Sequence, residues 1–149
     1  MNIAEKDANF ERDLGRSLTF LYRHRRKFMT ERLRSYGLCG AMYMMVLHVS
    51  RHPGTTQDSI ASHMCIDKSN VARRVKQLED LNYLRRETDP ADRRQNNLFL
   101  TEEGEALLPV IRKNLSEWGH SIAAGLTMEE REALHELLGK IMRGAGQEQ

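Results

Sequence analysis

The clearest pattern of apolar and polar positions lies in the middle of the chain, between Asp67 and Asn82. Apolar side chains recur there at intervals of three and four residues, at Val71, Val75, Leu78 and Leu81. This spacing predicts the buried face of an α-helix with about 3.6 residues per turn. Because asparagine tolerates the left-handed backbone conformation, Asn82 is expected to follow the end of this helix.

Polar side chains occupy the opposite face of the same predicted helix. The positions that point away from the apolar stripe are Ser69, Arg73, Lys76 and Gln77, with Asn70 and Arg74 on the flanks. These side-chain types bind base edges and phosphates in DNA. A solvated helix face gives the same pattern, so these residues alone leave both interpretations open.

The neighbouring segments favour the DNA-binding interpretation. The run Thr55-Thr56-Gln57-Asp58 is typical of a helix start, and residues 64–66 form a short break before Asp67, a good N-cap for the next helix. After Asn82, apolar runs at 83–84 and 98–100 flank a charged stretch rich in turn-forming residues, which predicts two strands and a projecting tip. Two helices across a short turn, followed by a basic hairpin, predict a helix-turn-helix with a wing.

Helical spacing extends over most of the remaining chain. It predicts a helix from Asp13 to about Leu33 after a frayed stretch at 1–10, and a buried, nearly all-apolar helix at 41–51. After the hairpin, Thr101 is expected to cap a helix with an acidic first turn. The sequence Thr127-x-x-Glu130 is a capping box that opens the last helix.

Charge is distributed unevenly along the 149 residues, although the net charge is only +2. Residues 23–100 carry 15 Lys and Arg against 8 Asp and Glu, whereas residues 101–149 carry 5 against 9. A basic middle between less basic ends is the charge pattern expected of a nucleic-acid-binding module with flanking elements. The run at 23–27 can be a solvated helix face, an auxiliary phosphate contact or a contact for an acidic partner.

Several motifs in this order resemble the MarR family of winged helix-turn-helix transcription regulators. They are I-D-K-S-N-V-A-R-R-V-K-Q-L-E-D, L-R-R, D-P-A-D-R-R-Q and L-T-E-E-G, within a similarity that extends over about 14–143. The family often has glycine where Asn82 stands, a mild departure because asparagine can adopt the same backbone conformation.

The resemblance implies a mainly α fold with a small β-hairpin wing, in a single domain over 1–149. The winged helix-turn-helix would span about 35–100, and about 10–34 and 101–143 would be dimerisation helices of a homodimer. The implied function is that of a double-stranded DNA-binding regulator of an inverted-repeat operator, most simply a repressor relieved by a small aromatic or apolar ligand or by a stress signal. The expected DNA-binding residues are Thr56, Lys68, Ser69, Asn70, Arg73, Arg74, Lys76, Gln77, Asp92, Arg93 and Arg94, and the expected pocket residues are Tyr22, Met42, Met45 and His48.

In this interpretation, Arg93 or Arg94 reaches a minor groove from the wing tip, and Asp92 orients the wing arginine rather than touching DNA. The competing hypothesis is a winged helix that serves as a protein-interaction module without DNA readout. Basic residues on the second helix and on the wing, such as Arg73 and Lys76, argue against that alternative.

Other chemistry has weaker support in the sequence. His48 and His52 have helical spacing for a metal pair, but no third ligand is indicated nearby, so no metal site and no cofactor are expected. Either Cys39 or Cys65 could sense oxidants, which the sequence leaves open. No catalytic motif, membrane span, signal peptide or disulfide framework is indicated, so a cytoplasmic protein that is not an enzyme is expected.

Overall fold

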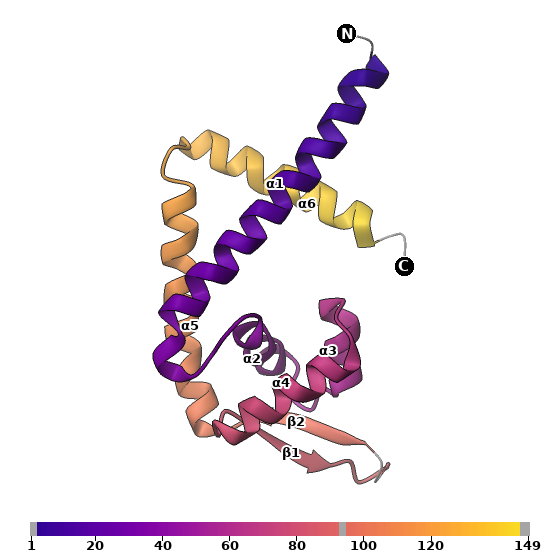
Figure 1. Cartoon of the computed structure of the whole chain (residues 1–149), viewed down its shortest axis with the longest axis vertical. Helices are drawn as coiled ribbons and strands as arrows, with labels where there is room; N and C mark the ends of the chain where they lie inside the picture. Colours follow the sequence, from indigo (N-terminus) through magenta and orange to yellow (C-terminus); the bar gives the residue numbers. More distant parts are fainter. Residues whose placement is uncertain (1–2, 93–94, 147–149) are drawn as a thin grey trace. The chain divides into compact units, whose positions relative to one another are not determined.

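The computed structural model describes residues 3–92 and 95–146, and the chain divides into two compact units, Met1–Leu115 and Ser116–Gln149 (Figure 1). The order of elements is α1 (Ile3–Arg32), η1 (Arg34–Tyr36), α2 (Met42–Arg51), α3 (Gln57–Met64), α4 (Lys68–Asp80), β1 (Leu84–Thr88), β2 (Asn96–Leu100), α5 (Glu102–Ile122) and α6 (Met128–Gly146). This mainly helical fold with one hairpin confirms the predicted fold class.

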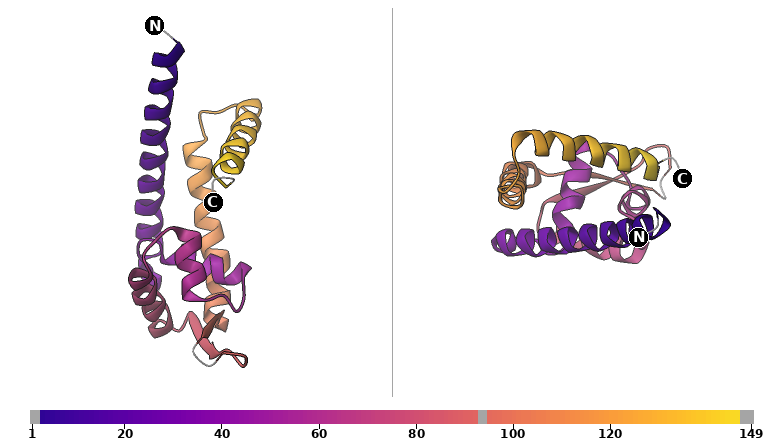
Figure 2. Two further views of the ribbon diagram at one scale, coloured as in Figure 1. Left: turned by 90° about the vertical axis from the view of Figure 1, so that its right-hand side faces the viewer. Right: turned by 90° about the horizontal axis from the view of Figure 1, so that it is seen from above.

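Helix α2 is the centre of the first unit. Met42, Met45, Val46 and Val49 are at most 1% exposed, as the nearly all-apolar sequence predicts. The core around α2 includes side chains from the end of α1, from α3, α4 and the hairpin, and from the first half of α5, among them Met29, Ile60, Val75, Leu98 and Ile111. The earlier turns of α1 extend beyond this core (Figure 2). Most of their side chains from residue 10 to residue 24 are exposed.

Local capping contacts set the bounds of the helix-turn-helix. The Thr56 hydroxyl accepts a hydrogen bond from the backbone of Ser59 and caps α3, and an Asp67 carboxylate oxygen accepts one from the backbone of Asn70 and caps α4. Between the two helices, Cys65 has a left-handed backbone with φ of 52°. Asn82 after α4 has φ of 60°, which confirms the prediction for that position.

The hairpin pairs antiparallel, with Leu84 opposite Leu100 and Thr88 opposite Asn96. The hairpin also pairs with the backbone of the loop at 54–55, a contact that the sequence did not indicate. Leu98 donates its backbone N–H to the carbonyl of Thr55 at 2.8 Å, and its own carbonyl accepts from Gly54 at 2.9 Å. The loop before α3 is therefore fixed to the base of the wing.

Two expectations about the ends of the chain had different outcomes. The prediction of a frayed stretch at residues 1–10 is wrong for residues 3–10, which belong to α1; alanine, glutamate and lysine favour a helix there, and no glycine or proline interrupts it. The capping box at α6 is confirmed, because the Thr127 hydroxyl and the Glu130 carboxylate each accept a hydrogen bond from the other residue's backbone N–H. Within the described ranges, no helix is both long and apolar enough to cross a membrane.

The wing meets α5 by a close approach of backbone at Gly104. A Cβ atom on Gly104 would lie 2.2 Å from the carbonyl oxygen of Tyr83. The same carbonyl accepts a hydrogen bond from the backbone of Thr101 at 3.1 Å, and the Thr101 hydroxyl donates to the carbonyl of Asn82. Only glycine fits this junction without moving the strand away from the helix.

We expect Gly104→Ala to lower the free energy of unfolding by about 1–3 kcal/mol, because backbone must move to admit the methyl group. Gly119→Ala is the matched control, since Gly119 lies in the same helix and a Cβ there meets nothing within 4 Å. The control should leave stability unchanged or raise it by up to about 1 kcal/mol, because alanine favours helix over glycine. Urea denaturation of both variants makes the comparison, and equal effects would contradict the close approach.

Candidate nucleic-acid interface

Helix α4 has one buried and one exposed face. Val71, Val75 and Leu78 are 0% exposed and pack into the core. The side chains on the other face are exposed: Lys68, Ser69, Arg73, Lys76 and Gln77. The packing of three apolar residues therefore directs the predicted reading face toward solvent.

The basic residues on this face differ in their ion pairs. Lys76 binds the carboxylate of Asp80 at 2.8 Å, and this hydrogen bond raises the pKa of Lys76. Lys68 pairs with Asp58 of α3 at 3.1 Å. In contrast, no acidic side chain of the described residues pairs with the exposed Arg73. Among the residues that the structure describes, Arg73 thus has no counter-charge beside it on this face.

Two predicted contact residues also organise helix ends. The Ser69 hydroxyl donates to the carboxylate of Asp67, and this bond is the main cause of a lowered pKa of Asp67. Thr56 caps α3. These hydroxyls lie at the N-termini of α4 and α3, where positive helix-dipole ends favour anions such as phosphate.

Arg74 lies at the edge of α4, apart from the other predicted DNA-binding residues of this helix. Its guanidinium Nη1 is 3.0 Å from the Cys39 sulfur in the loop before α2, and a longer contact of 3.4 Å reaches Gln77. Asn70 is half-buried, and within the described residues its side-chain oxygen has no hydrogen-bond partner. The structure thus brings Arg74 to the edge of α4 nearest the Cys39 loop.

The tip of the wing is organised by Asp89, which the sequence did not single out. Its carboxylate accepts hydrogen bonds from the backbone of Ala91 at 2.7 Å and from the side chain of Asn97 at 3.2 Å. The backbone bond from Ala91 is the main cause of a lowered pKa of Asp89. Asp92 is exposed beside it. The predicted contacts Arg93 and Arg94 lie outside the described residues.

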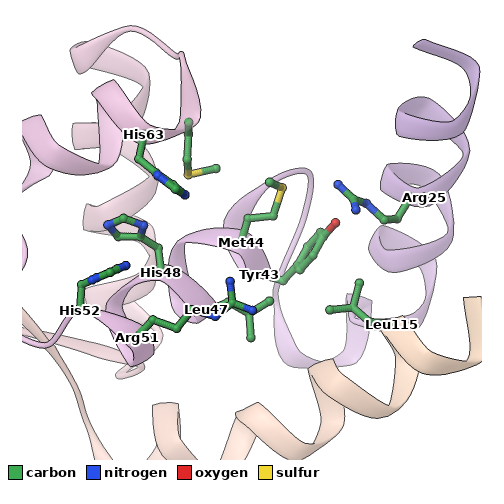
Figure 3. A pocket seen from close by; sticks show the side chains of 10 residues that line it. Arg25, Tyr43, Met44, Leu47, His48, Arg51, His52, His63 and Leu115 are labelled. Atoms are coloured by element: carbon green, nitrogen blue, oxygen red, sulfur yellow. The ribbon is translucent and has the colours of Figure 1, made fainter. Parts of the chain in front are cut away.

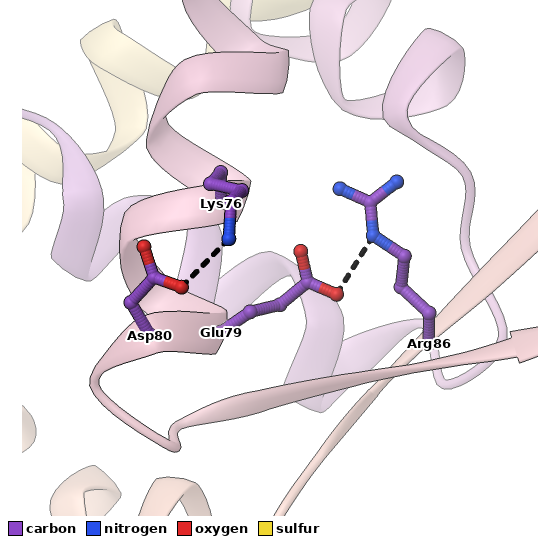
Figure 4. A network of polar contacts seen from close by, with 4 residues as sticks. All are labelled: Lys76, Glu79, Asp80 and Arg86. Carbon is purple, nitrogen blue, oxygen red and sulfur yellow. Dashed lines mark hydrogen bonds and ion pairs between the residues drawn. The ribbon is translucent and has the colours of Figure 1, made fainter.

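Arg86 joins the wing to both helices of the helix-turn-helix. Its guanidinium donates to the carboxylate of Glu79 on α4 at 2.7 Å (Figure 4), and both groups are partly shielded from solvent. With its amide oxygen facing Arg86, Gln57 of α3 accepts two further hydrogen bonds at 2.8 and 3.0 Å. The sequence analysis missed this network because its members are far apart along the chain.

A cavity of about 280 Å³ lies within the first unit (Figure 3). Basic and apolar side chains line it together: Arg25, Tyr43, Met44, Leu47, His48, Arg51, His52, His63, Met64 and Leu115. The sequence pairs His48 with His52, and the structure adds His63 of α3, whose ring centroid is 4.7 Å from that of His48. In the part of the chain described, no group of His, Cys, Asp or Glu side chains is arranged to hold a metal ion.

Of the four residues expected at a ligand pocket, only His48 lines the cavity. Met42 and Met45 instead belong to the closed core at 1% and 0% exposure, because α2 turns these two methionines inward. Tyr22 is 45% exposed on α1 and does not line the cavity. The methionine that does line it is Met44.

Comparison with known proteins agrees with this geometry. A family model described as the MarR family matches residues 42–95, from α2 to the tip of the wing. The chain is 31% identical over 107 residues to a candidate transcriptional regulatory protein for the hcr operon of Thauera aromatica, a match that covers 72% of this chain and 64% of that protein. The chain belongs to the MarR family.

Solved structures of MarR proteins share the fold. A crystal structure of MarR superposes with a TM-score of 0.86 at 29% identity, covering 90% of this chain and 91% of the other. A mutant of MarR from E. coli, complexed with operator DNA, superposes with a TM-score of 0.75 at 19% identity, covering 87% and 93%. The family consists of transcription regulators rather than enzymes, in agreement with the predicted class.

For this member of the MarR family we expect Arg86→Met to loosen the wing. Loss of the charged hydrogen bonds to Glu79 and Gln57 should cost about 1–2 kcal/mol of local stability. Amide hydrogen exchange in β1 and β2 should then be roughly tenfold faster. The control is Arg85→Met, because Arg85 lies next in the strand but contacts Glu87 and Phe99 of its own hairpin. Equal exchange in the two variants would contradict the assignment.

His48 gives a prediction about pH. Burial, and then the neighbouring His63, lower the pKa of His48 below its ordinary value of 6.5. The unfolded chain therefore takes up a proton near pH 6.5 while the folded chain does not, so stability falls as pH drops from about 6.5 toward the lower folded pKa. Thermal melts from about pH 8 to about pH 5 should show a smaller acid loss in His48→Gln than in wild type or in His135→Gln, whose site on α6 is exposed. An unchanged acid loss in His48→Gln would contradict this role.

Proposed function

We propose that this MarR-family protein is a cytoplasmic, homodimeric regulator that binds double-stranded DNA at an inverted-repeat operator and represses transcription until a ligand or stress signal releases it. One observation carries the DNA-binding part: α4 buries its apolar stripe and exposes Arg73, Lys76 and Gln77 on a helix-turn-helix next to a wing. Arginine, lysine and glutamine are residue types that read base edges in the major groove.

The proposed DNA contacts fall into two kinds, contacts with bases and contacts with phosphates. Arg73 and Gln77, one helical turn apart on the exposed face, are placed to contact bases. Lys68, Ser69 and Thr56 lie near helix N-termini and suit phosphate contacts that fix the position of the helix on the duplex. Arg93 and Arg94 remain proposed minor-groove contacts of the wing. A mutant of E. coli MarR, which has the same fold, forms a complex with operator DNA, in line with a DNA-binding function for this fold.

Exposed apolar surface supports a homodimer. Within the second unit, α6 exposes six large apolar side chains, Met128, Leu134, Leu137, Leu138, Ile141 and Met142. In the first unit, Phe10 and Phe20 of α1 are 64% and 68% exposed. Surface of this kind generally marks an interaction site. A two-fold dimer would place its two α4 helices on half-sites one helical turn of DNA apart, about 34–36 Å.

The histidine-lined cavity is the proposed ligand site. Its volume of about 280 Å³ is close to the lower end of small-molecule pockets. Met44, Leu47, Met64 and Leu115 give it apolar walls for a small aromatic or apolar ligand. His63 and Met64 are the last residues of α3, so a ligand there would act on the helix-turn-helix. In the proposed dimer it would change the distance between the α4 helices of the two protomers.

The decisive experiment is fluorescence anisotropy with DNA from upstream of the protein's own gene, against a scrambled duplex, at several salt concentrations. We expect tight, sequence-dependent binding with two chains per operator duplex. Arg73→Ala should weaken binding to the operator by about 1–3 kcal/mol and reduce discrimination. Arg112→Ala, an exposed arginine on α5, is the control and should change neither.

The outcomes separate the alternatives. Replacing Arg93 and Arg94 together with alanine should lower affinity for both duplexes and flatten the salt dependence. If wild type binds neither duplex even at low salt, the DNA-binding proposal fails, and a winged helix used only for protein interaction becomes the better account.

A further inference from the structure

Two arginines from distant parts of the sequence converge beside α4. Gly40, in the loop before α2, has φ of 58°, and a Cβ built on it would lie 3.5 Å from Nη2 of Arg26 and 3.7 Å from Nη2 of Arg74. Arg26 belongs to the last turns of α1, and Arg74 to the middle of α4. Both guanidinium groups therefore lie against the same glycine.

Neither guanidinium has a counter-charge within the described residues. The contacts of Arg74 are the Cys39 sulfur at 3.0 Å and the side-chain oxygen of Gln77 at 3.4 Å, and neither belongs to a carboxylate. Arg26 is exposed and forms no ion pair within the same part of the chain. Two like charges that converge without a carboxylate repel each other, and a bound anion removes this repulsion.

The loop between these arginines is held in place. The backbone N–H of Gly40 donates to the Thr30 hydroxyl of α1 at 3.1 Å, so the loop is tied to the same helix that carries Arg26. The Cys39 thiol is exposed next to Gly40. Gly40 is buried, and its lack of a side chain lets both guanidinium groups lie close to its backbone. The exposed Arg26 leaves this place open to an anion from solvent.

We propose that Arg26 and Arg74 form a clamp for one DNA backbone phosphate at the edge of α4, outside the major groove. The proposal rests on the DNA-binding function proposed above. Arg74 follows Arg73 directly on α4, so the clamp lies beside the face that reads bases. A helix in the major groove is bordered by the sugar–phosphate backbones, and a bidentate guanidinium is well suited to phosphate.

This assignment divides the basic run at residues 23–27 into separate roles. Arg25 points into the cavity, where it hydrogen bonds the side chain of Tyr43. Arg26 faces Gly40 and Arg74. Arg23 is exposed and contacts neither place, so it carries the same charge on the same helix without the clamp geometry. Arg23 is therefore the matched control for Arg26.

The first test measures binding of a fluorescein-labelled duplex of mixed sequence as a function of salt, since a phosphate contact does not depend on sequence. Arg26→Ala should reduce the slope of log K against log salt by about one unit per protomer. Arg23→Ala should keep the wild-type slope. Thermal stability of Arg26→Ala should be unchanged or higher, because the variant removes a repulsion; a lower melting temperature with an unchanged slope would overturn the clamp in favour of a structural role.

The second test uses Cys39 as a reporter, in a Cys65→Ser variant that leaves one thiol. A bound backbone should slow alkylation of Cys39 by a maleimide, whereas inorganic phosphate at the same phosphate concentration should not. Equal rates with and without duplex would overturn the clamp, and protection by inorganic phosphate alone would assign the site to a free anion. If wild type binds no duplex in the first test, the DNA-binding function itself fails; if wild type binds and Arg26→Ala matches it, only the clamp fails.

Discussion

Burial of the apolar stripe of α4 is the interaction on which the rest of the interface depends. Val71, Val75 and Leu78 are 0% exposed, and complete burial of such side chains stabilises a fold by about 1.5–3 kcal/mol each. Because the stripe fixes the rotation of the helix about its own axis, it also determines that Arg73 and Gln77 face outward. The residues proposed to contact DNA are therefore oriented by side chains that are buried in the core.

The basic side chains on this surface differ in their ion-pair partners, and each kind of pairing has a different consequence for DNA binding. Lys68 and Lys76 form exposed pairs with Asp58 and Asp80, and such pairs contribute about 0–1 kcal/mol, so phosphates can replace the carboxylates at little cost. Arg86 is partly shielded between Glu79 and Gln57 and serves the fold. Arg73 has no acidic partner to displace within the described residues, so its charge is available to DNA at once.

Much of this fold follows from local sequence signals. The caps Thr56, Asp67 and Thr127 and the left-handed Asn82 could be predicted because each depends on atoms within a few residues. The contact of Arg74 with Cys39 could not, since it joins residues 35 positions apart. The contact between His63 and His48 could not be predicted for the same reason, since the two residues lie in different helices, α3 and α2. Periodicity gives the face of a side chain, but tertiary packing decides its neighbour.

The position of the cavity connects the two parts of the proposed mechanism. Its histidines come from the end of α2 and the end of α3, and Cys65, which follows α3 directly, is the left-handed residue that turns the chain toward α4. In the proposed mechanism, a ligand in the cavity would act first on the turn between α3 and α4. Because the buried apolar stripe of α4 is close-packed, a change in the angle between α3 and α4 would move the whole helix, and Arg73 and Arg74 with it. A ligand bound beside His48, as proposed above, would therefore move the proposed DNA-contacting residues of α4 as one group.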